Sequence, residues 1–357
     1  MNIIITFYFN GPALGVAIYA RELLIRLIPL LVAEERTVEV WCSTDAYNYL
    51  SSEERLVKFC SMEPKLDRII SRVKFLIALP FRQSTQSIIL HLTNPFTPPI
   101  SRLHKSKVVS VIHDLNEFDQ HDKYGIARSF FRRILLTSAI KNSHSIICIS
   151  KHSESQVLNH FPLTGNISVI YNGAGTSLPL KARKPNKNIL MVGRLDPTGK
   201  NLWSALNLLD RWHATDNEIT VTLTGGINKS SENDANEFLA VLKNRKFIQY
   251  VGRTSDEELS MLYATAEFLL FFSKYEGFGL PAFEALRSYC PVVAHTCNKA
   301  LLELLPDEVI YTNEAEDLSI DQIRKRILKI DWINSRNSTM KYSWERTAVL
   351  YANHLLG

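Results

Sequence analysis

Phe268-Leu-Leu-Phe-Phe272 is followed by Ser273-Lys-Tyr-Glu-Gly-Phe-Gly-Leu-Pro281, then by Ala282-Phe-Glu-Ala-Leu-Arg-Ser-Tyr289 and by Pro291-Val-Val-Ala294. The first and last pieces are apolar runs too short for helices. Between them lie a loop with glycines and a segment with proline at its expected first helical position. The order is therefore strand, loop, helix, strand. This stretch predicts a βαβ unit.

The loop in this unit has the composition of a phosphate site. Gly277 and Gly279 allow the backbone to approach a ligand closely, and a helix that opens near Pro281 turns its free N–H groups toward the loop. Glu276 precedes the glycines, and Glu284 is expected in the first helical turn. Two carboxylates at such a place suit sugar hydroxyls better than further phosphate. The stretch predicts a sugar-nucleotide site.

Glu276-Gly-Phe-Gly-Leu-Pro-Ala-Phe-Glu284 resembles the E-x7-E signature of the retaining glycosyltransferases of family 4, which have the GT-B fold. The resemblance implies an α/β protein of two Rossmann-like, doubly wound domains that face each other across a cleft. An ordinary Rossmann-type loop with incidental glutamates remains the alternative.

The length of 357 residues allows two domains with a core each. Residues 176–187 are rich in proline and basic residues and lack a pattern, so they read as a linker. We expect an acceptor-binding domain at 1–178 and a nucleotide-sugar-binding domain at 186–340. The resemblance implies that 341–357 form a helix that returns to the first domain.

The composition is that of a soluble globular protein, with 46% hydrophobic and 22% charged residues. Five cysteines without a C-x-x-C pair read as reduced thiols, which favours the cytoplasm. The apolar start at residues 2–7 lacks a basic region and reads as a strand, not a signal peptide. No uncharged apolar run is long enough to span a membrane.

The net charge of +5 is uneven, because residues 1–178 hold 19 Lys and Arg against 14 Asp and Glu, and the other residues hold 22 of each. This excess suits an anionic lipid surface or a phosphate-bearing acceptor and is too weak to indicate nucleic acid. Residues 65–79 and 128–136 combine basic and apolar side chains. They predict either peripheral membrane contact or helices that face a core.

The first half begins with a strand at 3–9, a loop at 10–15 and a helix from Val16. The loop does not fit G-x-G-x-x-G, which argues against a nicotinamide enzyme. The resemblance implies that this loop lies beside the donor diphosphate and the acceptor. It assigns Gly15 to the donor and Gly11 to the acceptor side.

His113 and Asp114 follow a strand expected at 108–112, where α/β folds place their ligands. The resemblance implies that His113 contacts the transferred sugar, and we place Asp114 on the acceptor side. Asn172 and Gly173 resemble the family's Asn-Gly segment and are assigned to the donor. Because no second His or Cys stands at ligand spacing, we expect no metal site.

The second half opens with a strand and Gly193-Arg-Leu-Asp-Pro-Thr-Gly-Lys200. Arg194 and Lys200 are placed to neutralise a diphosphate without a metal, unless they are incidental charges of a surface loop. The chain also lacks a D-x-D motif. We expect no cofactor, with a nucleoside diphosphate sugar as co-substrate.

The resemblance implies transfer of a hexosyl unit, such as mannosyl or glucosyl, from a UDP-, GDP- or dTDP-sugar to a sugar hydroxyl, with retention. We expect a lipid-linked glycan of a bacterial surface polysaccharide (O-antigen, lipopolysaccharide or capsule) as acceptor, at the inner face of the plasma membrane. Catalytic roles fall to His113 and Glu276. The donor-binding residues of the second half are Arg194, Lys200, Gly277, Phe278, Gly279, Leu280 and Glu284. A sugar-nucleotide epimerase of the same fold and a catalytically silent glycan-binding subunit remain alternatives.

Overall fold

A computed structural model describes the chain at residues 2–9, 15–58, 61–64, 87–93, 106–115, 118, 126–161, 166–174, 181–227, 231–313, 315–316 and 318–357. The chain divides into two compact units. The first unit holds residues 1–173 and 342–357, and the second holds residues 174–341.

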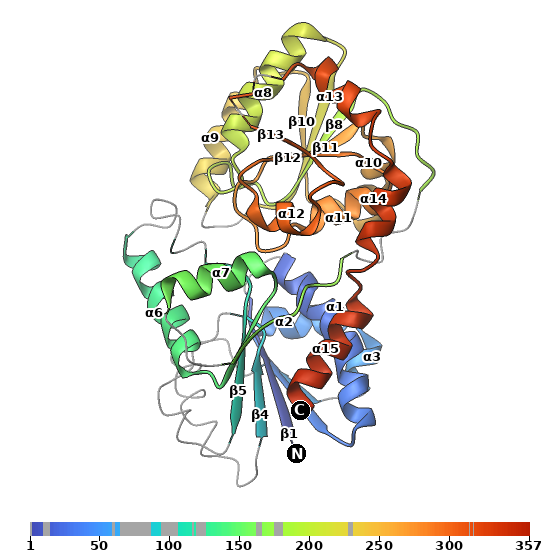
Figure 1. Ribbon diagram of the computed structural model, residues 1–357. Coiled ribbons are helices and arrows are strands. Elements are labelled where there is room, and N and C mark those ends of the chain that lie inside the picture. Colours follow the sequence, from blue (N-terminus) through green and yellow to red (C-terminus); the bar gives the residue numbers. More distant parts are fainter. Residues whose placement is uncertain are drawn as a thin grey trace. The chain divides into compact units, whose positions relative to one another are not determined.

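The first unit is built on a parallel sheet in the order β3-β2-β1-β4-β5-β6-β7 (Figure 1). Its strands are β1 Asn2–Phe7, β2 Thr37–Cys42, β3 Ser61–Pro64, β4 Ser87–His91, β5 Lys107–Ile112, β6 Ser145–Cys148 and β7 Asn166–Val169. Its helices are α1 Gly15–Ala33, α2 Thr44–Leu50, α3 Glu54–Val57, α6 Ile126–Asn142, α7 Lys151–His160 and α15 Trp344–Leu356. The strand order reverses between β1 and β4, which defines a doubly wound sheet.

The C-terminal helix belongs to the first unit. α15 lies along α1, and the hydroxyls of Tyr19 and Tyr351 are 2.7 Å apart in this contact. At its outer edge Arg26 Nε donates to Glu345 Oε1 at 2.7 Å. The last residues of the chain therefore complete the core of the unit that contains the first ones.

The second unit is built on a parallel sheet in the order β10-β9-β8-β11-β12-β13. Its strands are β8 Asn188–Val192, β9 Thr220–Thr224, β10 Ile248–Gly252, β11 Phe268–Phe271, β12 Val292–His295 and β13 Ile310–Thr312. Its helices are α8 Leu202–Thr215, α9 Glu232–Leu242, α10 Asp256–Thr265, α11 Leu280–Arg287, α12 Lys299–Leu304, α13 Ile320–Ile327 and α14 Trp332–Thr339. The order reverses between β8 and β11, so this sheet is doubly wound as well.

Part of the expected linker is packed against the second unit. Residues 181–187 have no regular structure, yet Arg183 donates to the carbonyl oxygens of Tyr263 and Glu267 at 2.9 Å each. The backbone N–H of Lys184 donates to the carbonyl of Ala264 at 2.9 Å. These bonds fix the entry to β8 along the end of α10.

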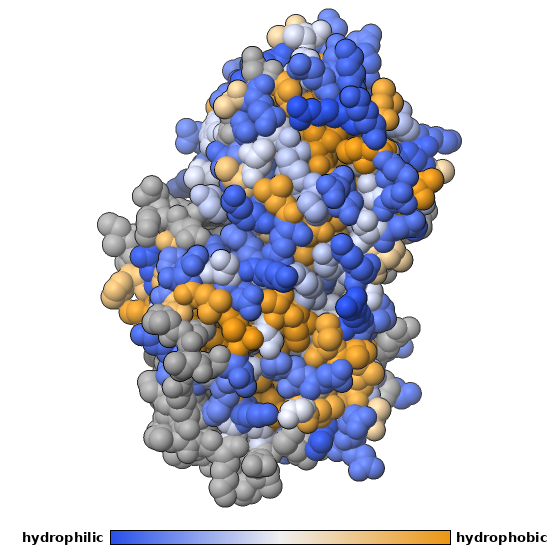
Figure 2. Space-filling view, viewed as in Figure 1, coloured by the Kyte–Doolittle hydropathy of each residue, from blue (hydrophilic) through white to orange (hydrophobic). Residues whose placement is uncertain are grey.

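One surface of the first unit exposes large apolar side chains. Phe130 and Ile134 lie one turn apart on α6 and are 66% and 45% exposed. Figure 2 shows pale and full orange atoms over this region, at the left edge of that unit. This helix contains the expected basic and apolar segment at 128–136, and the segment at 65–79 lies outside the described residues. Among the helices that the structure describes, none combines the length and the apolar character needed to cross a bilayer.

Candidate functional site

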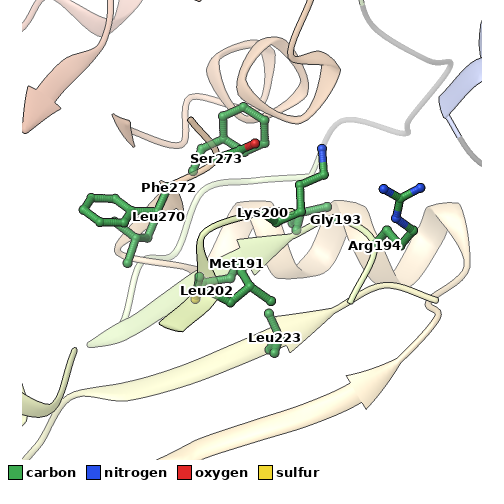
Figure 3. A pocket seen from close by; sticks show the side chains of 11 residues that line it. Met191, Gly193, Arg194, Lys200, Leu202, Leu223, Leu270, Phe272 and Ser273 are labelled. Atoms are coloured by element: carbon green, nitrogen blue, oxygen red, sulfur yellow. The ribbon is translucent and has the colours of Figure 1, made fainter. Parts of the chain in front are cut away.

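A pocket lies at the carboxyl ends of β8, β9 and β11 in the second unit, at the point where the strand order reverses (Figure 3). Ligands of open α/β sheets bind at such switch points. The pocket is lined by Met191, Val192, Gly193, Arg194, Lys200, Leu202, Leu223, Leu270, Phe271, Phe272 and Ser273. It thus has apolar walls and two cations on one loop.

The loop after β8 is held in one conformation by its own backbone. The N–H of Gly193 donates to the Thr224 carbonyl at 3.0 Å, and the N–H of Lys200 donates to the Asp196 carbonyl at 2.7 Å. The buried Asp196 carboxylate accepts the N–H of Gly199 at 3.0 Å. Gly199 is a regular part of this turn. The turn presents Lys200 beside the pocket.

Arg194 is anchored on one side only. Its Nη2 donates to Asp196 Oδ2 at 2.7 Å, while its Nε is buried and has no hydrogen-bond partner among the described residues. In Figure 3 the Arg194 and Lys200 side chains rise from the loop in the same direction. A guanidinium whose buried Nε has no partner in the described part of the chain has a reason to bind an anion.

Lys200 and Glu276 form an ion pair, with Lys200 Nζ 2.6 Å from Glu276 Oε1. Their side chains are 23% and 15% exposed. The pair joins the loop after β8 to the loop after β11, which are neighbouring strands. The cation expected at the diphosphate and the carboxylate expected at the sugar therefore lie at one place.

Two details of the segment after Glu276 differ from our expectation. Gly279 is the N-cap of α11 with a φ of 93°, a backbone conformation that favours glycine. The helix therefore begins at Leu280, and Pro281 is the second helical residue. Glu284 lies beyond the first turn, contrary to our prediction, because the left-handed Gly279 starts the helix one residue earlier. The helix α11 still begins directly after the loop that contains Gly277 and Gly279.

Glu284 is buried and held by a residue that the sequence did not suggest. Tyr263 Oη donates to Glu284 Oε2 at 3.0 Å, and its ring is fully buried. Burial raises the pKa of Tyr263 well above its usual value, so its hydroxyl stays a donor. Phe278 is also buried and stacks on Phe283 with ring centroids 4.7 Å apart. The Phe278 side chain is therefore a packing element of the loop.

His113 lies in the first unit, directly after β5. Its Nε2 is 2.8 Å from the carbonyl oxygen of Leu92. A carbonyl only accepts, so Nε2 carries a proton, and removal from water lowers the pKa of His113. The neutral ring then has its lone pair on Nδ1. It can accept a hydrogen bond from a hydroxyl.

The ring of His113 is packed edge to face against Tyr19 of α1, with centroids 4.7 Å apart. Tyr19 in turn meets α15 through Tyr351. Asp114 follows His113 and is half-buried. Gly15 is the first residue of α1, and Gly11 lies outside the described residues.

Asn172 and Gly173 have a packing role that the sequence did not reveal. A Cβ on Gly173 would lie 2.3 Å from Trp344 Cδ2, so only glycine fits there. Asn172 is buried, and its Oδ1 has no hydrogen-bond partner among the described residues. Of the two, Asn172 has the acceptor that a ligand could use. Gly173 lets Trp344, the first residue of α15, pack closely against the backbone after β7.

The expected site residues thus fall into two sets, each within one unit. The second unit brings Arg194 and Lys200 to one pocket and Glu276 into an ion pair with Lys200, with Glu284 on the adjacent helix. The first unit holds His113 with Asp114. Tyr263 and Tyr19 support these residues and were missed, because nothing in the sequence marks a partner that lies far away along the chain. Asp196 was missed although it lies only two residues from Arg194.

Two families match the chain, one for each half. Residues 15–178 match the family described as Glycosyltransferase Family 4, and residues 179–342 match the family described as Glycosyl transferases group 1. The chain belongs to the GT-B glycosyltransferases. This confirms the enzyme class and the fold expected from the E-x7-E resemblance.

Relatives and solved structures agree with this assignment. The glycosyltransferase is 25% identical over 247 residues to the O-antigen chain mannosyltransferase RfbU of Salmonella typhimurium, which covers 68% of each chain. A sucrose-phosphate synthase from Thermosynechococcus elongatus has a TM-score of 0.72 at 16% identity, covering 99% of this chain and 98% of its own. HepE of Anabaena, solved with UDP and glucose, has a TM-score of 0.68 at 15% identity, covering 100% and 98%. The two structures establish likeness of fold.

Proposed function

We propose that this glycosyltransferase moves a hexosyl unit from a nucleoside diphosphate sugar to a sugar hydroxyl during assembly of a bacterial surface polysaccharide. The Lys200–Glu276 ion pair beside the pocket carries the proposal, because it places a cation for phosphate next to a carboxylate for sugar hydroxyls. The likeness to an O-antigen mannosyltransferase supports the substrate class.

The contacts described above support the following roles. Arg194 and Lys200 hold the diphosphate together with the N-terminal N–H groups of α11. Glu284, oriented by Tyr263, accepts hydrogen bonds from the ribose hydroxyls. Glu276 binds hydroxyls of the transferred sugar, and the lone pair of His113 Nδ1, in the first unit, is an acceptor for a sugar hydroxyl.

The chemistry needs charge stabilisation more than a strong base. The bond between the anomeric carbon and the diphosphate oxygen breaks while the acceptor oxygen bonds to the same face of that carbon. The acceptor proton passes to the departing phosphate oxygen. Arg194 and Lys200 stabilise the negative charge that develops on the diphosphate, as fixed cations do in a preorganised site. The configuration is then retained.

A peripheral contact with an anionic membrane is a further part of the proposal. Phe130 and Ile134 on α6 are exposed beside Arg133, and an acceptor on a lipid would be met at such a surface. Replacement of both by Glu should abolish co-sedimentation with phosphatidylglycerol vesicles, whereas Glu at the exposed Met261 of the second unit should not. Equal vesicle binding by the wild type, the double variant and the Met261 variant would refute the proposed membrane contact.

The test of the main proposal is a thermal-shift screen against UDP, GDP and dTDP, followed by transfer from the matching sugar nucleotide. One nucleoside diphosphate should raise the melting temperature, because it binds only the folded protein. The shift should vanish in Lys200→Ala and persist in Lys187→Ala, whose ion pairs with Asp216 and Glu218 lie at the opposite end of β8. Absence of any shift would refute the donor class.

A further inference from the structure

Two side-chain amides, from the half-buried Asn201 and the buried Asn298, hold the end of β11 just before Glu276. Asn201 Nδ2 donates to the carbonyl oxygen of Phe272 at 3.3 Å. Asn298 Nδ2 donates to the carbonyl oxygen of Ser273 at 3.1 Å. The two acceptors belong to consecutive residues. We call this pair of bonds the asparagine clamp.

The carbonyls need these donors. The last paired residue of β11 is Phe271, and both Phe272 and Ser273 are 2% exposed. A buried carbonyl without a partner costs about 1–3 kcal/mol. Consecutive carbonyls of an extended segment point to opposite sides, so one donor has to come from each neighbouring strand. Asn201 follows β8 and Asn298 follows β12, which flank β11.

Each asparagine is suited to its position in a way that other residues are not. Asn298 Oδ1 accepts the N–H of Leu301 at 3.1 Å, which caps α12. Only one orientation of the amide meets both an N–H and a carbonyl, so the Nδ2 must face Ser273. Asn201 has a φ of 55°, which asparagine tolerates better than most residues, and its Oδ1 accepts from Ser204 Oγ at 2.8 Å.

The clamp acts on both members of the ion pair. Asn201 follows Lys200 directly in the chain, and its bond to Phe272 ties that turn to the strand that leads to Glu276. Asn298 holds Ser273, and Ser273 Oγ in turn donates to the Tyr275 carbonyl at 3.1 Å. The next residue in the chain is Glu276, whose Oε1 lies 2.6 Å from Lys200 Nζ. Three loops are thereby fixed relative to one another.

We infer that Asn201 and Asn298 are positioning residues, which hold Glu276 against Lys200 and so set the turnover of the enzyme. The inference rests on the proposed function for its kinetic part. A misplacement of about 1 Å at a reacting centre can cost about 100-fold in rate. Loss of one bond of the clamp should therefore reduce kcat by about 10- to 100-fold and leave nucleoside diphosphate affinity within about threefold.

Two substitutions of Asn298 separate positioning from folding. Asn298→Ser and Asn298→Asp keep a good N-cap for α12 and remove the amide donor. Asp also places a carboxylate oxygen against the Ser273 carbonyl. The matched control is Asn188→Asp, a buried asparagine at the start of β8 and at the other end of the sheet. We expect a drop in kcat for both Asn298 variants and none for the control.

A cycle with Glu276→Ala tests whether the effect passes through Glu276. If it does, Asn298→Ser should lower kcat when introduced into the wild-type protein and should cause no further loss of kcat in the Glu276→Ala background. An equal loss in both backgrounds, or an unchanged rate of Asn298→Ser, would overturn the inference while leaving the proposed function intact.

A crystal structure of Asn298→Asp supplies a readout that needs no substrate. We expect Glu276 to move out of ion-pair distance of Lys200, whereas Asn188→Asp should keep the pair near 2.6 Å. An undisturbed pair in Asn298→Asp would overturn the clamp whatever the enzyme transfers. Failure of all sugar nucleotides as donors would instead count against the proposed function.

Discussion

Lys200 and Glu276 are 76 residues apart in the chain, yet their charged atoms lie 2.6 Å apart where β8 and β11 end side by side. The doubly wound order places these two strands next to each other. The chain adds β9 and β10 on one side of β8 and then returns to add β11 on the other side. The sheet topology therefore builds the site: one strand end supplies the cation and the next supplies the carboxylate.

Lys200→Ala and Glu276→Ala should each lower kcat by at least about 100-fold, because each removes a charged group proposed to contact the donor. The melting temperature should change by a few degrees at most, since an ion pair with partly exposed side chains contributes about 1 kcal/mol or less. Initial rates with the donor found in the thermal-shift screen measure the effect. Lys187→Ala is the control, and full activity in both site variants would contradict the assignment.

Tyr263→Phe should weaken nucleoside diphosphate binding by about tenfold, because the Glu284 carboxylate loses the hydroxyl that orients it. A hydrogen bond to a charged group contributes about 1.5–3 kcal/mol. Titration calorimetry measures the change. Tyr311→Phe is the control, since Tyr311 Oη donates to the Leu305 carbonyl at 2.9 Å in the same unit. The same affinity loss in both variants would point to a general effect of losing a tyrosine hydroxyl.

Transfer should continue in excess EDTA, because Arg194 and Lys200 are proposed to stabilise the leaving diphosphate. The rate after chelation and dialysis, compared with the rate after adding back Mg²⁺ or Mn²⁺, measures this. Loss of activity that a metal restores would require a cation at the diphosphate. Transfer by the Asp196→Asn variant should also be insensitive to EDTA, because this substitution leaves both Arg194 and Lys200 in place.

The alternation of apolar runs with glycine loops predicted both sheets, since each element depends on residues that are near one another in the chain. The Ser255 capping box with Glu258 illustrates this, because both partners lie within one helical turn. The start of α11 was wrong by one residue, since the left-handed conformation of Gly279 is a property of the folded loop. Tyr263 and Asn298 were not predicted, because their bonds to Glu284 and Ser273 depend on how whole elements pack.

Gly173→Ala should destabilise the first unit by about 1–3 kcal/mol, the usual cost of an added group in a close-packed place. The new Cβ would meet the Trp344 ring at 2.3 Å and the Trp344 Cα at 2.5 Å. Thermal unfolding should show a transition lowered by several degrees. Gly226→Ala is the control, because no atom lies within 4 Å of its added Cβ. Equal melting temperatures of the two variants would mean that α15 can shift to accommodate the added methyl group at little cost in stability.

Stability of the first unit should fall as the pH drops from about 6.5 toward 4, because of His91 at the end of β4. Burial lowers the pKa of His91 to about 4, and its Nδ1 is 2.6 Å from Thr6 Oγ1. The folded protein keeps the ring neutral, whereas the unfolded chain protonates it below a pKa of about 6.5. The unfolded state therefore binds more protons in this window, and acid favours it. Above about pH 6.5 the ring is neutral in both states, so this acid-dependent loss of stability is absent.

The size of this effect can be isolated by substitution. At pH 5 the loss due to His91 should approach about 2 kcal/mol relative to pH 7.5, at about 1.4 kcal/mol per pKa unit. His91→Asn should be less stable at pH 7.5 but should lose about that much less on acidification, as measured by urea unfolding at both values. His160→Asn, at an exposed helix end, should keep the wild-type dependence. If His91→Asn and the wild type lose the same free energy, His91 is charged in the folded protein and the burial argument fails.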